Sequence, residues 1–333
     1  MKAVGTGILG TGSYLPKQEV TSVELAERVG VDPEWIERKT QIGSRRYAAP
    51  DEATSDLAVR AAERALTQSG LSADRVDYVI VSTSTGDSPQ PPTSYIVQDA
   101  LGATRAACFD VNVVCSGFVY ALALAHSLLA SGGGRYALVI GADVYSRSLD
   151  FDDRRTAVLL GDGAGAAVVG PAPEGTGFLA FDLSSFGSAQ GLIKVVAGGS
   201  RLPASAETVA DGGHFFRMDG RGVRDFVFEH VPPALRGLAE RAGVGLHDVD
   251  HFVPHQPNGV LLSELVQRCG LAGAHTCRTL ERYGNVGSAS VPVTLDDANR
   301  AGRLRPGDLV LLAGFGGGMS LGASLLRWGP VST

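Results

Sequence analysis

The stretch Gly134-Arg-Tyr-Ala-Leu-Val-Ile-Gly141 has a counterpart in Gly307-Asp-Leu-Val-Leu-Leu-Ala-Gly314, which lies 173 residues further along the chain. The same offset places Asn112 on Asn285. In a chain of 333 residues, a repeat at about half the length indicates that one unit was duplicated. We therefore expect equivalent loops of the two halves to face each other.

A turn-rich segment at 170–177, Gly-Pro-Ala-Pro-Glu-Gly-Thr-Gly, marks the boundary between the two halves. We expect an N-terminal half over residues 1–172 and a C-terminal half over residues 173–333. In both halves, short aliphatic runs typical of strands buried on both faces alternate with amphipathic runs of helical period. The pattern predicts strands over 76–81, 137–141, 249–253 and 309–313, and helices over 57–71, 117–130 and 231–242. This alternation predicts an α/β fold with covered sheets.

Composition and charge narrow the classes of function. The chain carries 29 basic and 35 acidic residues, and its scattered Lys and Arg side chains argue against a nucleic-acid partner. Met1 and Lys2 lead into a Gly-rich segment without a signal-peptide core, and no apolar run reaches the about 18 residues of a membrane span. We expect a cytoplasmic protein outside the membrane. The cysteines form no C-x-x-C pair, so free thiols are expected at Cys108, Cys115, Cys269 and Cys277.

Cys115 is a candidate nucleophile. It lies in Phe109-Asp-Val-Asn-Val-Val-Cys-Ser-Gly-Phe118, where a strand-like run ends and a helical run begins. Unsatisfied amides and the positive end of the helix dipole favour a thiolate at such a junction, so we expect a lowered thiol pKa. A buried cysteine with a purely structural role is the alternative interpretation.

Three more segments place polar groups or bare backbone after predicted strands. His255, in Phe252-Val-Pro-His-Gln-Pro-Asn258, is expected at a carboxyl-end loop, where α/β proteins bind ligands, unless it is a structural histidine. Asn285 shares the strand-to-helix setting of the Cys115 loop, although asparagine is also an ordinary turn residue. The glycines of Gly314-Phe-Gly-Gly-Gly-Met319 favour backbone amides held against a reacting oxygen, with a plain turn as the alternative.

Other glycine clusters do not support a nucleotide site. Gly10-Thr-Gly12 lacks the third glycine of a dinucleotide fingerprint, and Gly161-Asp-Gly-Ala-Gly165 lacks the Lys-Ser/Thr of a phosphate loop. No group of His, Cys, Asp or Glu residues has the spacing of a metal site. The motifs therefore support neither a nucleotide enzyme nor a metal site.

Four of these motifs, in their order along the chain, resemble the β-ketoacyl synthase III family of the thiolase superfamily, over about residues 5–328. The motifs are Phe-Asp-Val before Cys115, Pro-His-Gln-x-Asn at 254–258, Tyr-Gly-Asn at 283–285 and Gly-Phe-Gly-Gly-Gly at 314–318. The segments 197–201, 216–221 and 253–260 are especially similar to the acetoacetyl-CoA synthases of this family. The resemblance implies a five-layered αβαβα fold made of two duplicated α/β halves, and a homodimer.

The resemblance also implies a mechanism. Cys115 takes an acyl group from a coenzyme A thioester, with the amides of Cys115 and Gly316 as the oxyanion hole. His255 and Asn285 then donate hydrogen bonds to the carbonyl of a malonyl thioester as it loses carbon dioxide. The carbanion attacks the acyl-cysteine, and acetyl-CoA with malonyl-CoA would give acetoacetyl-CoA without a cofactor.

The resemblance assigns further residues to substrate binding. Trp35 and Lys39, four apart on one helix face, would hold the adenine and phosphates of coenzyme A together with Arg154. Asn258 would order the active-site histidine or a water beside it, and it is also expected among the residues that bind coenzyme A. Gln90 would stand at the gate of the acyl pocket, where some members of the family have Phe.

The identity of the extender remains open in the sequence. Members of the family that act on acyl carrier protein tend to carry basic residues on the helix after His-Gln-x-Asn, where they meet an acidic carrier. Here residues 259–268 have Val260 at a usual arginine position and Arg268 as the one basic residue. This difference favours malonyl-CoA over a malonyl carrier protein.

Other functions are weighed against the same residues. A carrier-dependent priming ketosynthase of fatty-acid or polyketide biosynthesis would use the same nucleophile, and a related acyltransferase would pass the acyl group to an alcohol or amine. Papain-like hydrolases have the same Cys, His, Asn order but a Cys-Gly-Ser-Cys-Trp type signature, which is missing here. A non-catalytic scaffold would not need to keep all three side chains in their motifs.

Overall fold

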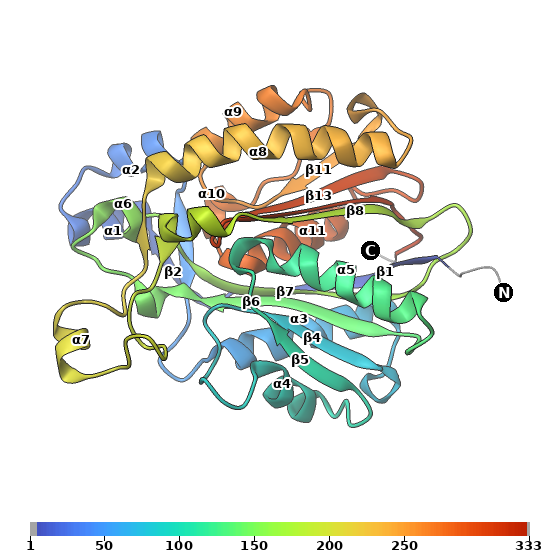
Figure 1. Ribbon diagram of the computed structural model, residues 1–333, viewed down its shortest axis with the longest axis horizontal. Coiled ribbons are helices and arrows are strands. Elements are labelled where there is room, and N and C mark those ends of the chain that lie inside the picture. Colours follow the sequence, from blue (N-terminus) through green and yellow to red (C-terminus); the bar gives the residue numbers. More distant parts are fainter. Residues whose placement is uncertain (1–4, 332–333) are drawn as a thin grey trace.

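The computed structural model describes residues 5–331, so Met1 and Lys2, on which the expectation about a signal peptide depends, lie outside the described residues. Two five-stranded sheets form the centre of the molecule (Figure 1). The first sheet has the order β1-β7-β6-β4-β5. Its strands are β1 (Thr6–Tyr14), β4 (Tyr78–Ser82), β5 (Ala107–Val111), β6 (Ala137–Val144) and β7 (Asp162–Pro171).

The second sheet repeats the first in connectivity and direction. Its order, read from the equivalent edge, is β8-β14-β13-β11-β12. Its strands are β8 (Gly177–Ser185), β11 (His251–Pro254), β12 (His275–Thr276), β13 (Leu309–Gly316) and β14 (Ser320–Arg327). In each sheet the third, fourth and fifth strands of this order run parallel and the remaining pairs run antiparallel. The connection 172–176 joins β7 to β8, and the predicted boundary at residue 172 falls in it.

Helices form three layers around the two sheets. In the central layer, α5 (Gly117–Ala130) and α11 (Ser290–Arg300) contact strands of both sheets. Helices α3 (Thr54–Ser69) and α4 (Thr93–Leu101) cover the outer face of the first sheet. Helix α8 (Gly220–Arg241) covers the second sheet, with α9 (Gly259–Cys269) beside it (Figure 1). The predicted fold, two duplicated α/β halves in five alternating layers, is confirmed.

The apolar runs identified in the sequence form the interior. Every residue of β6 and of β13 is buried, because helices cover both faces of each sheet. Glycines bring the central helices close to the strands. A Cβ on Gly165 of β7 would lie 2.6 Å from the backbone nitrogen of Val293 on α11, so only glycine permits this approach.

Helix α8 begins earlier than the sequence predicts. The predicted helix 231–242 is the second half of α8, which begins at Gly220 with Asp219 as its N-cap. The prediction was wrong because Pro232 and Pro233, which lie inside the helix, lack the amide of an interior residue and are typical of helix starts.

Short elements gather at one end of the layers, at the left of Figure 1. The helices of this end cap are α1 (Ser22–Val29), α2 (Pro33–Thr40), α6 (Arg154–Ala157), α7 (Ala206–Ala210) and α10 (Leu280–Tyr283). Its strands are β2 (Gln18–Thr21), β3 (Ser44–Tyr47), β9 (Ile193–Lys194) and β10 (Arg217–Met218). Among residues 5–331, no helix combines the length and apolarity needed to cross a membrane.

Candidate active site

A cavity of about 380 Å³ brings the predicted catalytic residues together between the end cap and the two sheets. Cys115, His255, Asn285 and Gly316 line it, although they lie far apart in the sequence. Cys115, His255 and Asn285 are 8%, 1% and 9% exposed, so the reacting groups are screened from water. Loops of the two halves therefore meet at one cavity, as the repeat predicts.

The Cys115 loop is strained and held by glycines. Cys115 lies in a short 3₁₀ turn, η2 (Val114–Ser116), between β5 and α5. Val114 has φ +46°, a conformation that is rare for a β-branched residue. A Cβ on Gly316 would lie 2.9 Å from Cys115 Sγ, and one on Gly317 would lie 3.1 Å from a Val114 methyl carbon. Only glycines therefore let the end of β13 approach the thiol this closely.

Burial sets the ionisation of Cys115. It raises the thiol pKa to about 12, the nearby Asp143 carboxylate adds to this, and hydrogen bonding from the Gly317 and Cys115 amides lowers it only in part. The prediction of a lowered thiol pKa is wrong, because the water-free setting outweighs the helix terminus. The resting residue is therefore a protonated thiol at neutral pH.

His255 follows β11, and its backbone amide donates to Ala313 O of β13 at 2.6 Å. Its ring meets the edge of the Phe315 ring at 5.6 Å between centroids. Burial lowers the pKa of His255 to about 3, so the imidazole is neutral at physiological pH. Its buried Nδ1 has no hydrogen-bond partner among residues 5–331. A neutral imidazole carries one N–H, which suits it to donate a hydrogen bond into the cavity.

Asn285 is fixed at both its backbone and its side chain. Its amide donates to Leu159 O at 2.8 Å, and its carbonyl accepts from Gly161 N at 2.9 Å. Its side-chain Oδ1 accepts from Gly287 N at 2.9 Å. Because Oδ1 is engaged, Nδ2 is the group that remains to donate toward a ligand in the cavity.

Of the residues predicted to hold the adenine and phosphates of coenzyme A, two line the cavity and one does not. Trp35 and Lys39 of α2 line the cavity, with Lys39 exposed. Arg154 is not among the lining residues, although its guanidinium lies 5.7 Å from the Trp35 ring centroid. Arg155 lines the cavity instead and pairs with Asp153 at 3.0 Å.

The structure places Asn258 at the cavity and Gln90 away from it. Asn258 lines the cavity, but its Oδ1 accepts from the amides of Val260 and Leu261, and its Nδ2 donates to Lys39 O. The side chain therefore caps α9 and ties it to α2, with no hydrogen bond to the histidine. Gln90 is exposed and does not line the cavity, so a single chain does not bring it to the acyl site.

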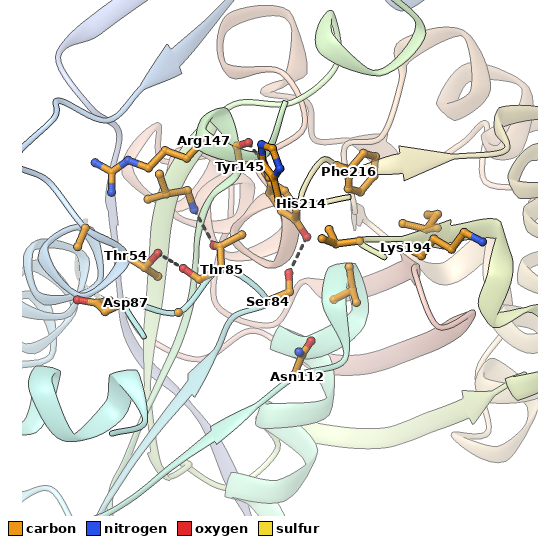
Figure 2. Close-up of a pocket in the computed structure, with 17 residues that line it drawn as sticks. Thr54, Ser84, Thr85, Asp87, Asn112, Tyr145, Arg147, Lys194, His214 and Phe216 are labelled. Atoms are coloured by element: carbon orange, nitrogen blue, oxygen red, sulfur yellow. Dashed lines mark hydrogen bonds between the residues drawn. The ribbon is translucent and has the colours of Figure 1, made fainter. Parts of the chain in front are cut away.

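A second cavity has a volume of about 530 Å³. The side chains that line it are drawn in Figure 2, and it adjoins the first cavity. Both are lined by Tyr145, Ile193 and Phe216, which therefore form the wall between them. The Tyr145 ring meets Phe216 edge-on at 5.8 Å between centroids, and its hydroxyl lies 2.6 Å from Ser84 Oγ. The sequence analysis missed Tyr145, which directly follows the carboxyl end of β6, the same signal that singled out His255.

The sequence analysis also missed a group of paired charges at the first cavity. Glu264 of α9 lines the cavity and pairs with Arg268 at 2.7 Å and with Arg224 of α8 at 3.2 Å. Nowhere among residues 5–331 do three His, Cys, Asp or Glu side chains come together in a way that could hold a metal ion.

Comparison with known proteins agrees with this geometry. Residues 109–187 match the family 3-oxoacyl-[acyl-carrier-protein (ACP)] synthase III, and residues 239–328 match its C-terminal family. The acetoacetyl CoA synthase NphT7 of Streptomyces sp. (strain CL190) is 52% identical over 323 residues, which are 96% of this chain and 98% of that protein. The β-ketoacyl-[acyl-carrier-protein] synthase III of Symbiobacterium thermophilum is 44% identical, covering 99% of this chain and 100% of that protein.

Solved structures show the same architecture. The priming β-ketosynthase of the R1128 polyketide biosynthetic pathway superposes with a TM-score of 0.91 at 36% identity, covering 98% of this chain and 97% of that chain. The 3-oxoacyl-[acyl-carrier-protein] synthase III of Aquifex aeolicus VF5 gives 0.90 at 35% identity, covering 97% and 100%. The chain therefore belongs to the 3-oxoacyl-[acyl-carrier-protein] synthase III family, the ketosynthase III group of acyltransferase-type condensing enzymes.

Proposed function

We propose that this protein condenses an acyl-CoA starter, first of all acetyl-CoA, with malonyl-CoA to give a β-ketoacyl-CoA. The observation that carries the proposal is the meeting of Cys115, His255, Asn285 and Gly316 in one buried cavity. A relative named acetoacetyl CoA synthase, 52% identical over nearly the whole chain, supports the CoA-level reaction.

In the first half-reaction, Cys115 Sγ attacks the thioester carbonyl of the acyl-CoA. The Sγ–carbon bond forms, the carbon–sulfur bond to coenzyme A breaks, and the proton of the cysteine thiol ends on the coenzyme A thiol. The amides of Cys115 and Gly316 would hold the oxyanion, because Gly316 is pressed against the nucleophile. The neutral imidazole of His255, in the same cavity, is available to carry the proton.

In the second half-reaction, malonyl-CoA loses carbon dioxide and the electron pair of the broken bond passes to its thioester enolate. His255 and Asn285 Nδ2 would donate to the enolate oxygen, where the charge develops. The enolate carbon attacks the acyl-cysteine, the Cys115 thiolate leaves, and it takes a proton from solvent. Neither step consumes an external oxidant or reductant, and protein donors supply the charge stabilisation, so we propose that the reaction needs no redox cofactor and no metal.

Two observations support malonyl-CoA as the extender. Glu264 pairs with Arg224 and Arg268 beside the cavity and offsets one of their two positive charges, which weakens attraction to an acidic carrier protein. Val260, at the position where an arginine is usual, presents an apolar side chain that is 45% exposed. The homodimer and the role of Gln90 as an acyl-pocket gate stay predictions, as do the roles of Trp35, Lys39, Arg154 and Asn258 toward coenzyme A.

Product analysis by mass spectrometry tests the proposal. Purified protein is incubated with acetyl-CoA and malonyl-CoA, with and without acyl carrier protein, beside the Cys115→Ala variant. We expect acetoacetyl-CoA without the carrier and none from the variant. Product formed only on the carrier would replace the proposal with a priming ketosynthase, and acyl transfer to an alcohol or amine without carbon dioxide release would replace it with an acyltransferase.

A further inference from the structure

The duplication gives the Cys115 loop a counterpart without a thiol. The offset of 173 residues places Ser288 on Cys115 and Asp143 on Gly316. The structure agrees, because Ser288 lies in the 3₁₀ turn η6 (Gly287–Ala289) before α11, and Asp143 lies near the end of β6 as Gly316 ends β13. In the second copy, a serine therefore stands in the place of Cys115, and an aspartate stands in the place of Gly316.

Asp143 is a fully buried carboxylate that accepts hydrogen bonds from two segments. Ser288 N donates to Oδ2 at 2.8 Å, and the Ser288 hydroxyl has two acceptors at 2.8 Å, Oδ2 and Ser82 O. On the other side, Oδ1 accepts from Thr83 Oγ1 at 3.2 Å, Ser84 N at 3.0 Å and Thr85 Oγ1 at 2.9 Å, with Ser84 Oγ at 3.3 Å. Among residues 5–331, no basic group lies within ion-pair distance of Asp143. Hydrogen bonds alone compensate this carboxylate.

These bonds connect Asp143 to the catalytic asparagine. Gly287 N donates to Asn285 Oδ1, and the next residue, Ser288, is held by Asp143. There is no free space at this turn, because a Cβ on Gly287 would collide with Asp143 Oδ2 and with the Tyr145 ring. The position of the turn, and with it the direction of Asn285 Nδ2, depends on the Asp143 carboxylate.

We propose that Asp143 is a positioning residue of the condensation half-reaction, whose carboxylate fixes the turn η6 and thereby holds Asn285 where the malonyl enolate forms. The inference rests on the proposed function, which it deepens. Asp143 does not contact Gly316 or the Cys115 amide through any hydrogen bond, so acylation of the thiol depends on it much less.

Burial raises the pKa of Asp143, and the hydrogen bonds from Ser84, Ser288 and Thr85 lower it only in part. In its ionised form the side chain places negative charge near the nucleophile. Burial is the main cause of the raised pKa of Cys115 in η2 and of Tyr145 after β6, and the Asp143 charge adds to both. The loop after β4 and the turn η6 contribute only hydroxyls and amides. Replacing the charge with a neutral amide is therefore expected to lower the thiol pKa, which a loss of packing alone does not do.

The main test is Asp143→Asn, which keeps the shape of the side chain. The amide of asparagine has one oxygen that can accept, whereas both oxygens of Asp143 accept a backbone N–H. The NH₂ group of the variant must therefore face the N–H of either Ser288 or Ser84, so that a donor meets a donor. We expect transfer of radiolabelled acetyl groups to Cys115 at the wild-type rate or faster. Condensation with malonyl-CoA is expected to fall about tenfold to a hundredfold, because misplacement by about 1 Å has costs of that order. The pH profile of Cys115 alkylation by iodoacetamide is expected to shift to lower pH.

Two further variants separate positioning from loss of stability. Ser288→Ala removes a hydroxyl that faces Oδ2, on the Asn285 side, whereas Thr83→Val removes a hydroxyl that faces Oδ1 with little change of shape. Ser288→Ala is expected to lower the ratio of condensation to acylation severalfold, and Thr83→Val to leave that ratio unchanged. This pair decides the question even where Asp143→Asn fails to fold.

Three results would overturn the inference: a folded Asp143→Asn protein with wild-type condensation, equal losses of both half-reactions, or an alkylation profile that does not move. Alkylation needs no substrate, and each variant is compared with wild type. A wild-type protein that forms no acetoacetyl-CoA would instead refute the proposed function, so the two failures are distinguishable.

Discussion

Replacing Gly316 by alanine places a methyl group against the nucleophile. The new Cβ would lie 2.8 Å from the Cβ of Cys115 and 2.9 Å from its Sγ. Ordinary carbon contacts begin near about 3.5 Å, so the sulfur or the end of β13 must shift by about half an ångström or more. The shift displaces the amide of residue 316 from the place where an acyl oxyanion would form. Losing one such donor costs about 10²- to 10³-fold in rate, or about 3–4 kcal/mol of transition-state stabilisation.

The assay is single-turnover transfer of radiolabelled acetyl groups from acetyl-CoA to the protein, followed at several pH values. Gly187→Ala is the matched control, because a Cβ at that glycine meets no atom within 4 Å. Acetyl-CoA affinity, measured by calorimetry, is expected to change little in Gly316→Ala, since the substitution lies at the reacting end of the cavity. Acylation of Gly316→Ala within threefold of wild type would refute the reasoning that this glycine permits the oxyanion geometry.

Three further outcomes are expected. Because the folded-state pKa of His255 is about 3, the unfolded chain takes up this proton first as pH falls below about 6.5. This group therefore lowers the free energy of unfolding by about 1.4 kcal/mol for each pH unit between about pH 6.5 and 3. When the free energy of unfolding is measured by urea titration at several pH values, its dependence on pH should be shallower for His255→Asn by one proton. Trp35→Ala should raise KM for acetyl-CoA about tenfold with little change in kcat, because stacking on adenine is worth about 1–3 kcal/mol; an unchanged KM would remove the assignment. Glu264→Gln frees Arg224 and Arg268, so turnover of malonyl carrier protein relative to malonyl-CoA should rise severalfold at low salt, and a ratio that stays constant would contradict the charge argument.

The sheets were predictable because their strands are buried on both faces. Such strands must be aliphatic along their length, and the runs at 137–141 and 309–313 mark β6 and β13 directly. The offset between the halves predicted which loops are equivalent. Cys115 and Asn285 were therefore expected at equivalent strand-to-helix junctions. Their meeting in one cavity follows from the shared central layer of α5 and α11.

Features that depend on three-dimensional surroundings were not predictable. The local sequence shows Cys115 at a helix start, but not the burial or the Asp143 charge that raise its pKa. Asn258 has the residue type to assist a histidine, yet the same amide satisfies the first turn of α9. The Glu264 pairs depend on how α8 and α9 lie together, which no periodicity encodes.

The resting charges of the site fit a reaction in which negative charge arises on the substrate. A thiolate paired with an imidazolium would place a charge pair in the cavity before substrate arrives, and burial opposes both members of that pair. With the thiol protonated and the imidazole neutral, the fixed donors line a buried cavity without a charge pair of their own. Their full electrostatic effect is then available to the oxyanion and the enolate, the two species whose charge develops only in the reaction. The burial that raises the pKa of Cys115 is therefore the same burial that strengthens His255 and Asn285 as donors to a developing negative charge.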